Sequence, residues 1–339
     1  MKKLLCILII LGLAAAGVGC SSSSGKEDVV YDLKMHHAGP EGHPYYLGAE
    51  RFKELVEEKS DGKIRIDIFP NNEISAGAKA VEAVQMGTLD IALESSMAIG
   101  GFVPEMGVLD LPFLFGNREE VKAVMDGEIG AELSARAEEK GFKVLYYWDN
   151  GFRNISNSHK PILTPNDLRG LKIRVPESKI YIATFEALGA IPTPMAFNEL
   201  FTALQLGTVD GQENPNGHMI TYNLYEVQKY FSITNHIYTA EPLIIRGDLF
   251  DKMPPEYQQI LLDAAREAGE YQRQLSADRE ADYLKQITEK QVEVSYPELE
   301  PFRDAVKPVY DVYRQQYGDL VDRIFEAEAS LSEGGEGNA

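Results

Sequence analysis

Apolar and polar residues alternate along much of the chain with a period of two, which is typical of strands that bury one face. In "LKIRVPES" (171–178), apolar residues alternate with Lys172 and Arg174, and Pro176 ends the pattern. Intervening stretches have helical spacing, and the alternation predicts an α/β fold in which helices cover both faces of a mostly parallel sheet. The expected strands are "VVYDLKMHHA", "GKIRIDIFP", "TLDIALES", "GFKVLYYWD", "FRNISNS", "LKIRVP" and "TVDGQEN". The expected helices are "HPYYLGAERFKELVEEKS", "AGAKAVEAVQMG", residues 117–140, "SKIYIATFEALG" and "FNELFTALQLG".

An internal repeat predicts two lobes of similar plan. The stretch "AVQMGTLD" (83–90) matches "ALQLGTVD" (203–210), and in each copy a glycine suited to a left-handed cap closes the helix. The same offset along the chain makes Glu94 the counterpart of Asn214, each at the far end of its strand. We therefore expect these two polar side chains to face one crevice between the lobes.

A long helical pattern without an internal proline covers residues 256–291. At 1.5 Å per residue it would extend about 50 Å, which exceeds the span of one small lobe. We expect this helix to brace both lobes.

The domain boundaries follow from these patterns. Lobe 1 is expected at 29–150 plus about 240–279, and lobe 2 at 151–239 plus about 280–330. The composition of 331–339, "LSEGGEGNA", predicts a disordered tail.

The first residues have the pattern of a secretory signal. Lys2 and Lys3 precede an uncharged apolar stretch that is too short to span a membrane, so residues 1–19 are interpreted as a signal peptide. The following Cys20 and "SSSSG" resemble a bacterial lipoprotein acylation site, with 20–28 as a lipid-anchored flexible tether. Gly17 departs from the usual leucine or valine, and plain secretion is the alternative. Both interpretations predict a protein of the periplasm or cell envelope.

Composition excludes several functions. Cys6 and Cys20 are the two cysteines, so the chain beyond the tether has no disulfide, thiol catalysis or thiolate metal site. The net charge of −20 argues against a nucleic-acid partner. An anionic ligand is still compatible with this charge, because salt screens charges beyond about 8 Å and a local pair of arginines can dominate a closed cleft.

Arg174 is the first candidate for ligand binding, because it stands at the carboxyl end of a strand, where α/β sheets hold ligands. The competing interpretation is a solvated charge on an edge strand. The segment around it, "GFRNISNSHKPILTPNDLRGLKIRVPES" and onward to "GTVDGQENP", resembles the extracytoplasmic solute-binding proteins of TRAP (tripartite ATP-independent periplasmic) transporters. The resemblance extends from about Asp32 to Phe325 and includes "LDLPFLF".

This resemblance implies a two-lobed, periplasmic-binding-protein-like α/β fold with a hinge. A monomer of this kind closes on an organic acid, delivers it to the TRAP membrane subunits, performs no reaction and needs no cofactor or metal.

The resemblance also implies roles for residues of the second lobe. Arg174 would make a bidentate ion pair with a ligand carboxylate, a task that suits the planar guanidinium. Arg153 would lie near the same carboxylate or an adjacent hydroxyl, with a structural salt bridge as the alternative. Phe197 would pack on the carbon skeleton of the ligand; the alternative is a hydrophobic staple at a helix capped by Asn198. Asn214 would hydrogen-bond ligand oxygens.

Three further candidates complete the predicted site. Glu94 would accept hydrogen bonds from ligand hydroxyl or amine groups, and His37 would donate or accept in the same crevice unless it is a structural histidine. Glu177 stands where some relatives have asparagine, and a carboxylate there favours hydroxyl groups over a second ligand carboxylate. The set predicts a sugar acid such as a uronate as the ligand. A C4-dicarboxylate whose distal end reaches Arg153 is the second hypothesis.

Two other functions have less support in the sequence. A sugar-acid-converting enzyme would need catalytic machinery, and the chain has no G-x-S-x-G, no phosphate-binding loop, no dinucleotide fingerprint and no H-E-x-x-H motif. A metal site through His36, His37 and His43 has less support, because a loose histidine trio before a helix is usually solvated.

Overall fold

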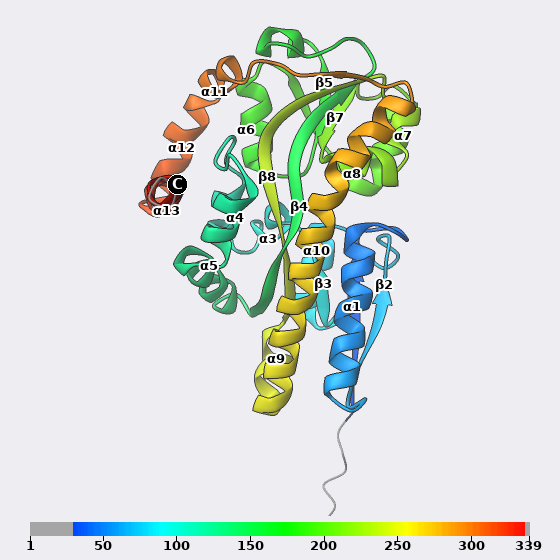
Figure 1. Ribbon diagram of the computed structural model, residues 1–339, viewed down its shortest axis with the longest axis vertical. Coiled ribbons are helices and arrows are strands. Elements are labelled where there is room, and N and C mark those ends of the chain that lie inside the picture. Colours follow the sequence, from blue (N-terminus) through cyan, green and yellow to red (C-terminus); the bar gives the residue numbers. More distant parts are fainter. Residues whose placement is uncertain (1–29, 336–339) are drawn as a thin grey trace, which may run out of the picture.

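The computed structural model describes residues 30–335 and shows two lobes joined by long central strands (Figure 1). The predicted signal peptide, Cys20 and the tether lie outside the described residues. Within the described part, none of the helices combines the length and the apolar character that a membrane crossing requires.

All strands of the described chain belong to one mixed sheet, in the order β2-β1-β3-β8-β4-β7-β5-β6, with β9 paired to β8. At one end β1 pairs in parallel with β2 and β3, and at the other β5 pairs in parallel with β6 and β7. The strands are β1 (Tyr31–His37), β2 (Ile64–Phe69), β3 (Ile91–Leu93), β4 (Phe142–Asn157), β5 (Lys172–Val175), β6 (Ile191–Pro194), β7 (Gly211–Asn214), β8 (Tyr230–Arg246) and β9 (Glu293–Ser295).

The central strands β4 and β8 correct the expectation of a mostly parallel sheet. They pair with each other in antiparallel fashion over nearly their whole length, and β3–β8 and β4–β7 are antiparallel as well. The predicted strands "GFKVLYYWD" and "FRNISNS" are therefore one strand that passes through both lobes. Register shifts occur in it between Asp149 and Gly151, where Gly151 has φ +116°, and at two other points. Bulges of this kind bend a strand without ending it.

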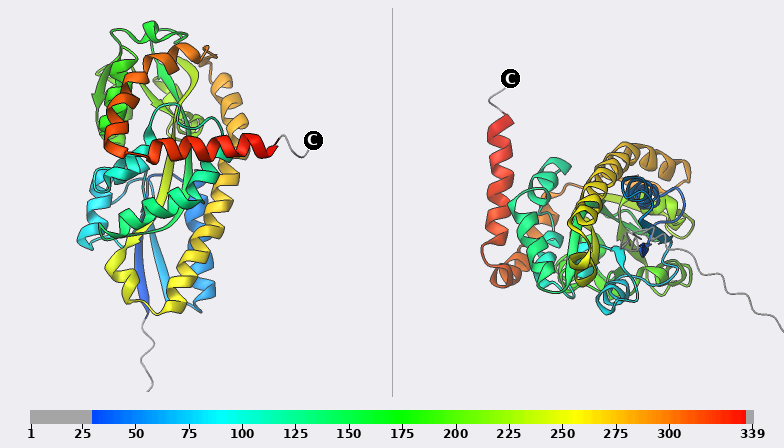
Figure 2. Two further views of the ribbon diagram at one scale, coloured as in Figure 1. Left: turned by 90° about the vertical axis from the view of Figure 1, so that its left-hand side faces the viewer. Right: turned by 90° about the horizontal axis from the view of Figure 1, so that it is seen from below.

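Helices cover the sheet, and α10 braces both lobes as predicted. It packs on α1 in the first lobe and on α8 in the second, and it also contacts β4 (Figures 1 and 2). The helices are α1 (Pro44–Lys59), α2 (Ala78–Met86), α3 (Ser96–Ile99), α4 (Arg118–Met125), α5 (Glu128–Glu138), α6 (Lys179–Ala187), α7 (Leu200–Gln205), α8 (Asn216–Thr221), α9 (Gly247–Lys252), α10 (Pro255–Glu289), α11 (Glu300–Ala305), α12 (Lys307–Tyr317) and α13 (Leu320–Gly335).

Two details differ from the expected helices. The helix expected at 117–140 is two helices, because the chain breaks at Asp126 and Gly127 between α4 and α5. Helix α13 packs on α4 and projects from the body (Figure 2), and it reaches Gly335, so residues 331–335 of the predicted tail are helical.

The internal repeat corresponds to equal local structure in both lobes. Gly87 and Gly207 have φ values of 74° and 68°, in the left-handed region that glycine adopts without steric cost. In the first copy the Thr88 amide donates to the Ala83 carbonyl at 3.0 Å, and in the second the Thr208 amide donates to Ala203 at 2.9 Å. The two caps therefore start β3 and β7 in the same way.

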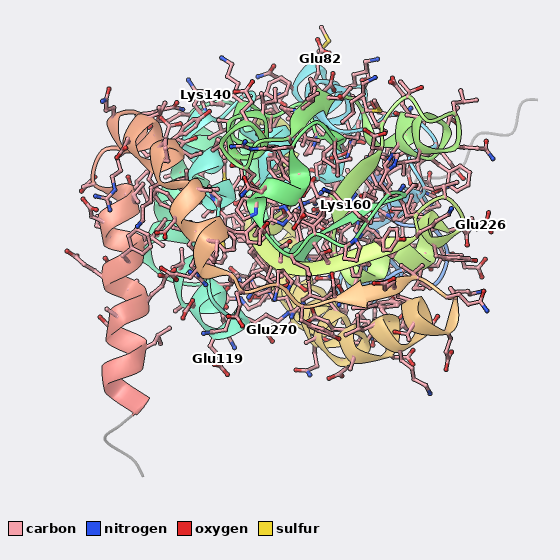
Figure 3. The ribbon with its side chains drawn as sticks, turned by 90° about the horizontal axis from the view of Figure 1, so that it is seen from above. Glu82, Glu119, Lys140, Lys160, Glu226 and Glu270 are labelled. Carbon is pink, nitrogen blue, oxygen red and sulfur yellow. The ribbon has the colours of Figure 1, made fainter. Side chains whose placement is uncertain are left out.

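The core of the first lobe is closed by Trp148 on β4, which is fully buried between β4 and α10. Its indole N–H donates to the Ala265 carbonyl at 3.3 Å. Gly269 on α10 leaves room for the ring, because a Cβ there would lie 2.7 Å from the indole nitrogen. Charged side chains such as Glu82, Lys140 and Glu270 lie at the periphery of the molecule (Figure 3).

Candidate ligand-binding site

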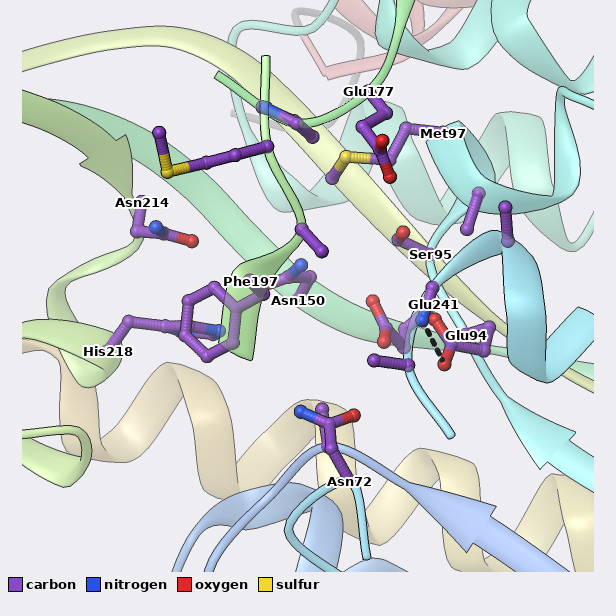
Figure 4. A pocket seen from close by; sticks show the side chains of 18 of the residues that line it. Asn72, Glu94, Ser95, Met97, Asn150, Glu177, Phe197, Asn214, His218 and Glu241 are labelled. Carbon is purple, nitrogen blue, oxygen red and sulfur yellow. Dashed lines mark hydrogen bonds between the residues drawn. The ribbon is translucent and has the colours of Figure 1, made fainter. Parts of the chain in front are cut away.

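A cavity of about 150 Å³ lies between the lobes, where the carboxyl ends of β3, β5 and β7 meet the middle of β4 and β8. Figure 4 shows Asn214, His218 and Phe197 on one side and Glu94, Ser95 and Glu241 on the other. Six of the seven predicted binding residues line it: Glu94, Arg153, Arg174, Glu177, Phe197 and Asn214. The other lining residues are Ala38, Tyr45, Asn72, Ala76, Gly77, Ala78, Ser95, Met97, Ala98, Gly101, Asn150, Pro176, Met195, Ala196, His218 and Glu241.

Arg174 on β5 is a buried cation that has no carboxylate partner among the described residues. The residue is 3% exposed, and its Nε and Nη2 atoms both donate to the Met195 carbonyl, at 3.1 and 2.7 Å. These bonds fix the guanidinium by one side and leave the Nη1/Nη2 end, the fork that matches a carboxylate. Burial lowers the pKa of Arg174 to about 10, so the group stays charged at neutral pH.

Arg153 on β4 is already neutralised. Nε donates to Oε2 of Glu213 at 2.6 Å and Nη2 donates to Oε1 at 2.8 Å, and both residues are buried. His236 also contacts Glu213 Oε2, at 3.2 Å. The guanidinium of Arg153 holds the pKa of Glu213 below its usual value despite burial. The structural salt bridge considered for Arg153 is therefore present, and the same residue lines the cavity.

Asn214 and Phe197 lie beside the two arginines. The Oδ1 atom of Asn214 accepts a hydrogen bond from Arg153 Nη2 at 3.0 Å, which orients its amide at the cavity wall. The ring centroid of Phe197 lies 5.7 Å from Cζ of Arg174, and its edge meets His218. Phe197 begins a short 3-10 helix before α7, and Asn198 makes no capping hydrogen bond there. The structure therefore does not support the alternative in which Phe197 forms a hydrophobic staple at a helix capped by Asn198.

Glu94 follows β3 on the first lobe. Its Oε1 atom accepts hydrogen bonds from the Gly77 amide and contacts His36 Nε2, both at 3.1 Å. The structure places His36 here and not His37, because successive residues of β1 point to opposite faces. His37 does not line the cavity; it is buried with its ring edge-on to Tyr46, and burial lowers its pKa to about 3.

Glu177 lies at the rim of the cavity and is exposed, directly after the proline that ends the strand pattern. Arg174 lies in β5, and Glu177 comes two residues after the end of that strand. Met97, from the first lobe, lies near it in Figure 4. Glu177 is therefore the solvent-exposed member of the six predicted residues that line the cavity.

Sequence reasoning missed several lining residues, of which Glu241 on β8 is the most informative. Glu241 is buried, and burial together with neighbouring Glu94 raises its pKa well above the usual value for a glutamate. Asn150 and Tyr45 lie in the same wall. An acidic residue inside an otherwise apolar run, "TAEPLIIR", was the signal that could have indicated Glu241.

The cavity is therefore electrostatically polarised. Of the residues that the structure describes, Arg174 at the second-lobe end is a cation without an ion-pair partner, and the first-lobe end has two carboxyl groups, Glu94 and Glu241. In the described part of the chain, no group of three or more histidine, cysteine or acidic side chains is placed to hold a metal ion. The arrangement can bind a small anion whose other end offers hydroxyl groups.

Comparisons with known proteins agree with this geometry. A family model described as bacterial extracellular solute-binding protein, family 7, matches residues 35–316. The chain is 35% identical over 326 residues to the 2,3-diketo-L-gulonate-binding periplasmic protein of Escherichia coli K12, covering 95% of this chain and 97% of that protein. It is 32% identical over 345 residues to a C4-dicarboxylate-binding protein of Bacillus subtilis 168, covering 96% and 99%. The structure of a sugar acid binding protein of Advenella mimigardefordensis in complex with galactonate is similar with a TM-score of 0.86 and 33% identity, covering 89% of this chain and 99% of that one.

Proposed function

The chain belongs to family 7 of the bacterial extracellular solute-binding proteins, and we propose that it captures a sugar acid outside the cytoplasm and delivers it to the membrane subunits of a TRAP transporter. The ligand carries one carboxylate, which pairs with Arg174, and several hydroxyl groups. It undergoes no reaction in the site.

One observation carries this proposal: the buried guanidinium of Arg174 has no carboxylate partner within residues 30–335, although Arg174 lines a cavity. A buried charge without a partner is costly, and a ligand carboxylate removes that cost. Hydrogen bonds to charged groups contribute roughly 1.5–3 kcal/mol each, so two of them supply much of a micromolar affinity.

The far end of the cavity favours a sugar acid over a C4-dicarboxylate. Glu94 presents a carboxylate near the place where a second ligand carboxylate would lie, and like charges at close range are unfavourable. Arg153 offers that second carboxylate little, because Glu213 already neutralises it. The relatives include proteins named for each ligand class, and C4-dicarboxylate binding is the second candidate.

Capture would proceed by closure of the lobes. Ligand contacts to Arg174 and Asn214 on one lobe and Glu94 on the other favour the closed form through its higher affinity. The boundaries that we propose for the moving units are 29–150 plus about 240–279 and 151–239 plus about 280–330. We further propose a monomer in the periplasm or cell envelope, anchored by a lipid at Cys20 after removal of residues 1–19.

Titration calorimetry with galactonate, galactose and succinate tests the proposal. We expect tight binding of galactonate, no binding of galactose, which lacks the carboxylate, and weaker binding of succinate. Equal affinities for galactonate and galactose would refute the carboxylate anchor. Tighter binding of succinate would replace the sugar-acid assignment with the dicarboxylate one. Mass spectrometry of the membrane-associated protein tests the lipid at Cys20, because an unmodified mature amino terminus would contradict it.

A further inference from the structure

Glu241 on β8 is a buried carboxyl group of the cavity, and one of its oxygens has no hydrogen-bond partner within residues 30–335, whereas hydrogen bonding with Tyr45 and Asn150 acts in favour of its carboxylate. The residue is 3% exposed, and its Oε2 atom has no hydrogen-bond partner among the described residues. Most buried polar atoms in folded proteins are paired, so an unpaired one requires a physical explanation. Because Glu241 lines the cavity, a ligand can reach it.

The surroundings of Glu241 favour the uncharged acid. Three ionisable groups face Glu241: Glu94 in the loop after β3, Tyr45 on α1 and Tyr222 at the end of α8. The nearby cation is Arg153 on β4. That cation is already engaged by a buried carboxylate in the adjacent strand. Burial, and secondly the charge of Glu94, therefore raise the pKa of Glu241 well above its usual value.

Glu94 has the complementary character of an acceptor. Its Oε1 atom accepts a hydrogen bond from the Gly77 amide and meets a ring nitrogen of His36. The two carboxyl groups thus differ in surroundings, although they stand side by side at one end of the cavity (Figure 4).

We propose that Glu241 is a specificity-determining residue that acts as a neutral acid beside Glu94, so that the pair selects a ligand hydroxyl group at the end of the cavity opposite Arg174. The hydroxyl oxygen accepts the Glu241 O–H, and the hydroxyl hydrogen is donated to Glu94. A methyl or methylene group in that place leaves the Glu241 O–H without an acceptor and offers no hydrogen to Glu94. A second carboxylate there competes with Glu94 for the same hydrogen. This inference rests on the proposed function and specifies the ligand chemistry that the first lobe recognises.

Two substitutions test the inference by calorimetry with galactonate. Glu241→Gln keeps an uncharged donor of the same shape, and Glu241→Leu removes the donor at similar volume. We expect Glu241→Gln to bind nearly as well as wild type at acidic pH and Glu241→Leu to lose about tenfold, the effect of one hydrogen bond of roughly 1.4 kcal/mol.

The pH profile separates recognition from packing. The wild type should lose affinity as the pH rises through the raised pKa of Glu241, because the acid that donates becomes ionised, whereas Glu241→Gln should keep a flatter profile. Equal profiles for the two proteins, or an equal loss in Glu241→Gln and Glu241→Leu at acidic pH, would overturn the inference. The profile comparison decides the matter even if Glu241→Leu does not fold.

Arg174→Lys in the same series keeps the two proposals distinguishable. If Arg174→Lys loses affinity while both Glu241 variants bind as wild type, the inference about Glu241 fails and the carboxylate anchor stands. If Arg174→Lys binds as tightly as wild type, the proposed function itself fails.

Discussion

Replacing Arg174 with lysine removes the fork while keeping a positive charge in the same place. In the structure, Nε and Nη2 donate to the Met195 carbonyl, which leaves the Nη1/Nη2 end for a ligand of the cavity that Arg174 lines. A lysine ammonium has no second nitrogen. It can serve either the Met195 carbonyl or one carboxylate oxygen well, but it cannot present two parallel donors.

The expected loss is about one charge-assisted hydrogen bond. Such a bond contributes roughly 1.5–3 kcal/mol, which corresponds to a roughly 10- to 140-fold higher Kd for a carboxylate ligand. The long-range Coulomb attraction stays, so binding should weaken and not vanish.

Calorimetry with galactonate measures this change, and Arg169→Lys provides the matched control. Arg169 is exposed, lies on the same connection into β5 and does not line the cavity, so its variant should bind as wild type. Thermal denaturation must show both variants folded. A Kd for Arg174→Lys equal to that of the control would refute the argument that the fork is required.

Three other changes test the surroundings of the site. Glu213→Gln breaks the buried pair with Arg153 and should cost about 3–5 kcal/mol in the free energy of unfolding at neutral pH. The pKa of Glu213 is lowered in the folded state, so its stabilisation of the wild type is present above the usual glutamate pKa and is lost on acidification. The difference in melting temperature between wild type and Glu213→Gln should therefore shrink at low pH. A difference that does not change with pH would contradict this. His37→Phe should leave galactonate affinity unchanged, since His37 does not line the cavity, and a clear loss would place it in the binding machinery. Gly269→Ala should lower the melting temperature, although the same change on an exposed helix raises it, because the new Cβ would lie 2.7 Å from the Trp148 indole nitrogen.

The parts of the fold with clear periodicity could be predicted, whereas β8 was not predicted and β4 was predicted as two separate strands. Each short parallel strand begins after a cap or turn with a local signal, such as the glycines at 87 and 207. Strand β8 has no such pattern, because it is buried on both faces for most of its length and includes polar residues such as Thr234, His236 and Glu241. Burial on both faces removes the alternation on which strand prediction depends.

The candidate site shows the same division. Arg174, Asn214 and Glu94 stand at strand ends, and strand ends of an α/β sheet meet at the ligand crevice. The choice between His36 and His37 depended on which face of β1 is turned to Glu94, and adjacent residues of a buried strand give no sequence signal for that. Glu241 lies within β8, so its place at the cavity followed from the antiparallel pairing of β4 and β8 and from no motif.

The unbroken passage of β4 and β8 through both lobes determines how the receptor can flex. A hinge made of loops would concentrate the change in a few backbone dihedral angles. Two hydrogen-bonded strands would instead bend gradually over several residues. For the closure proposed above, we expect β4 and β8 to bend with their backbone pairing kept, so that the strands themselves set the angle between the lobes.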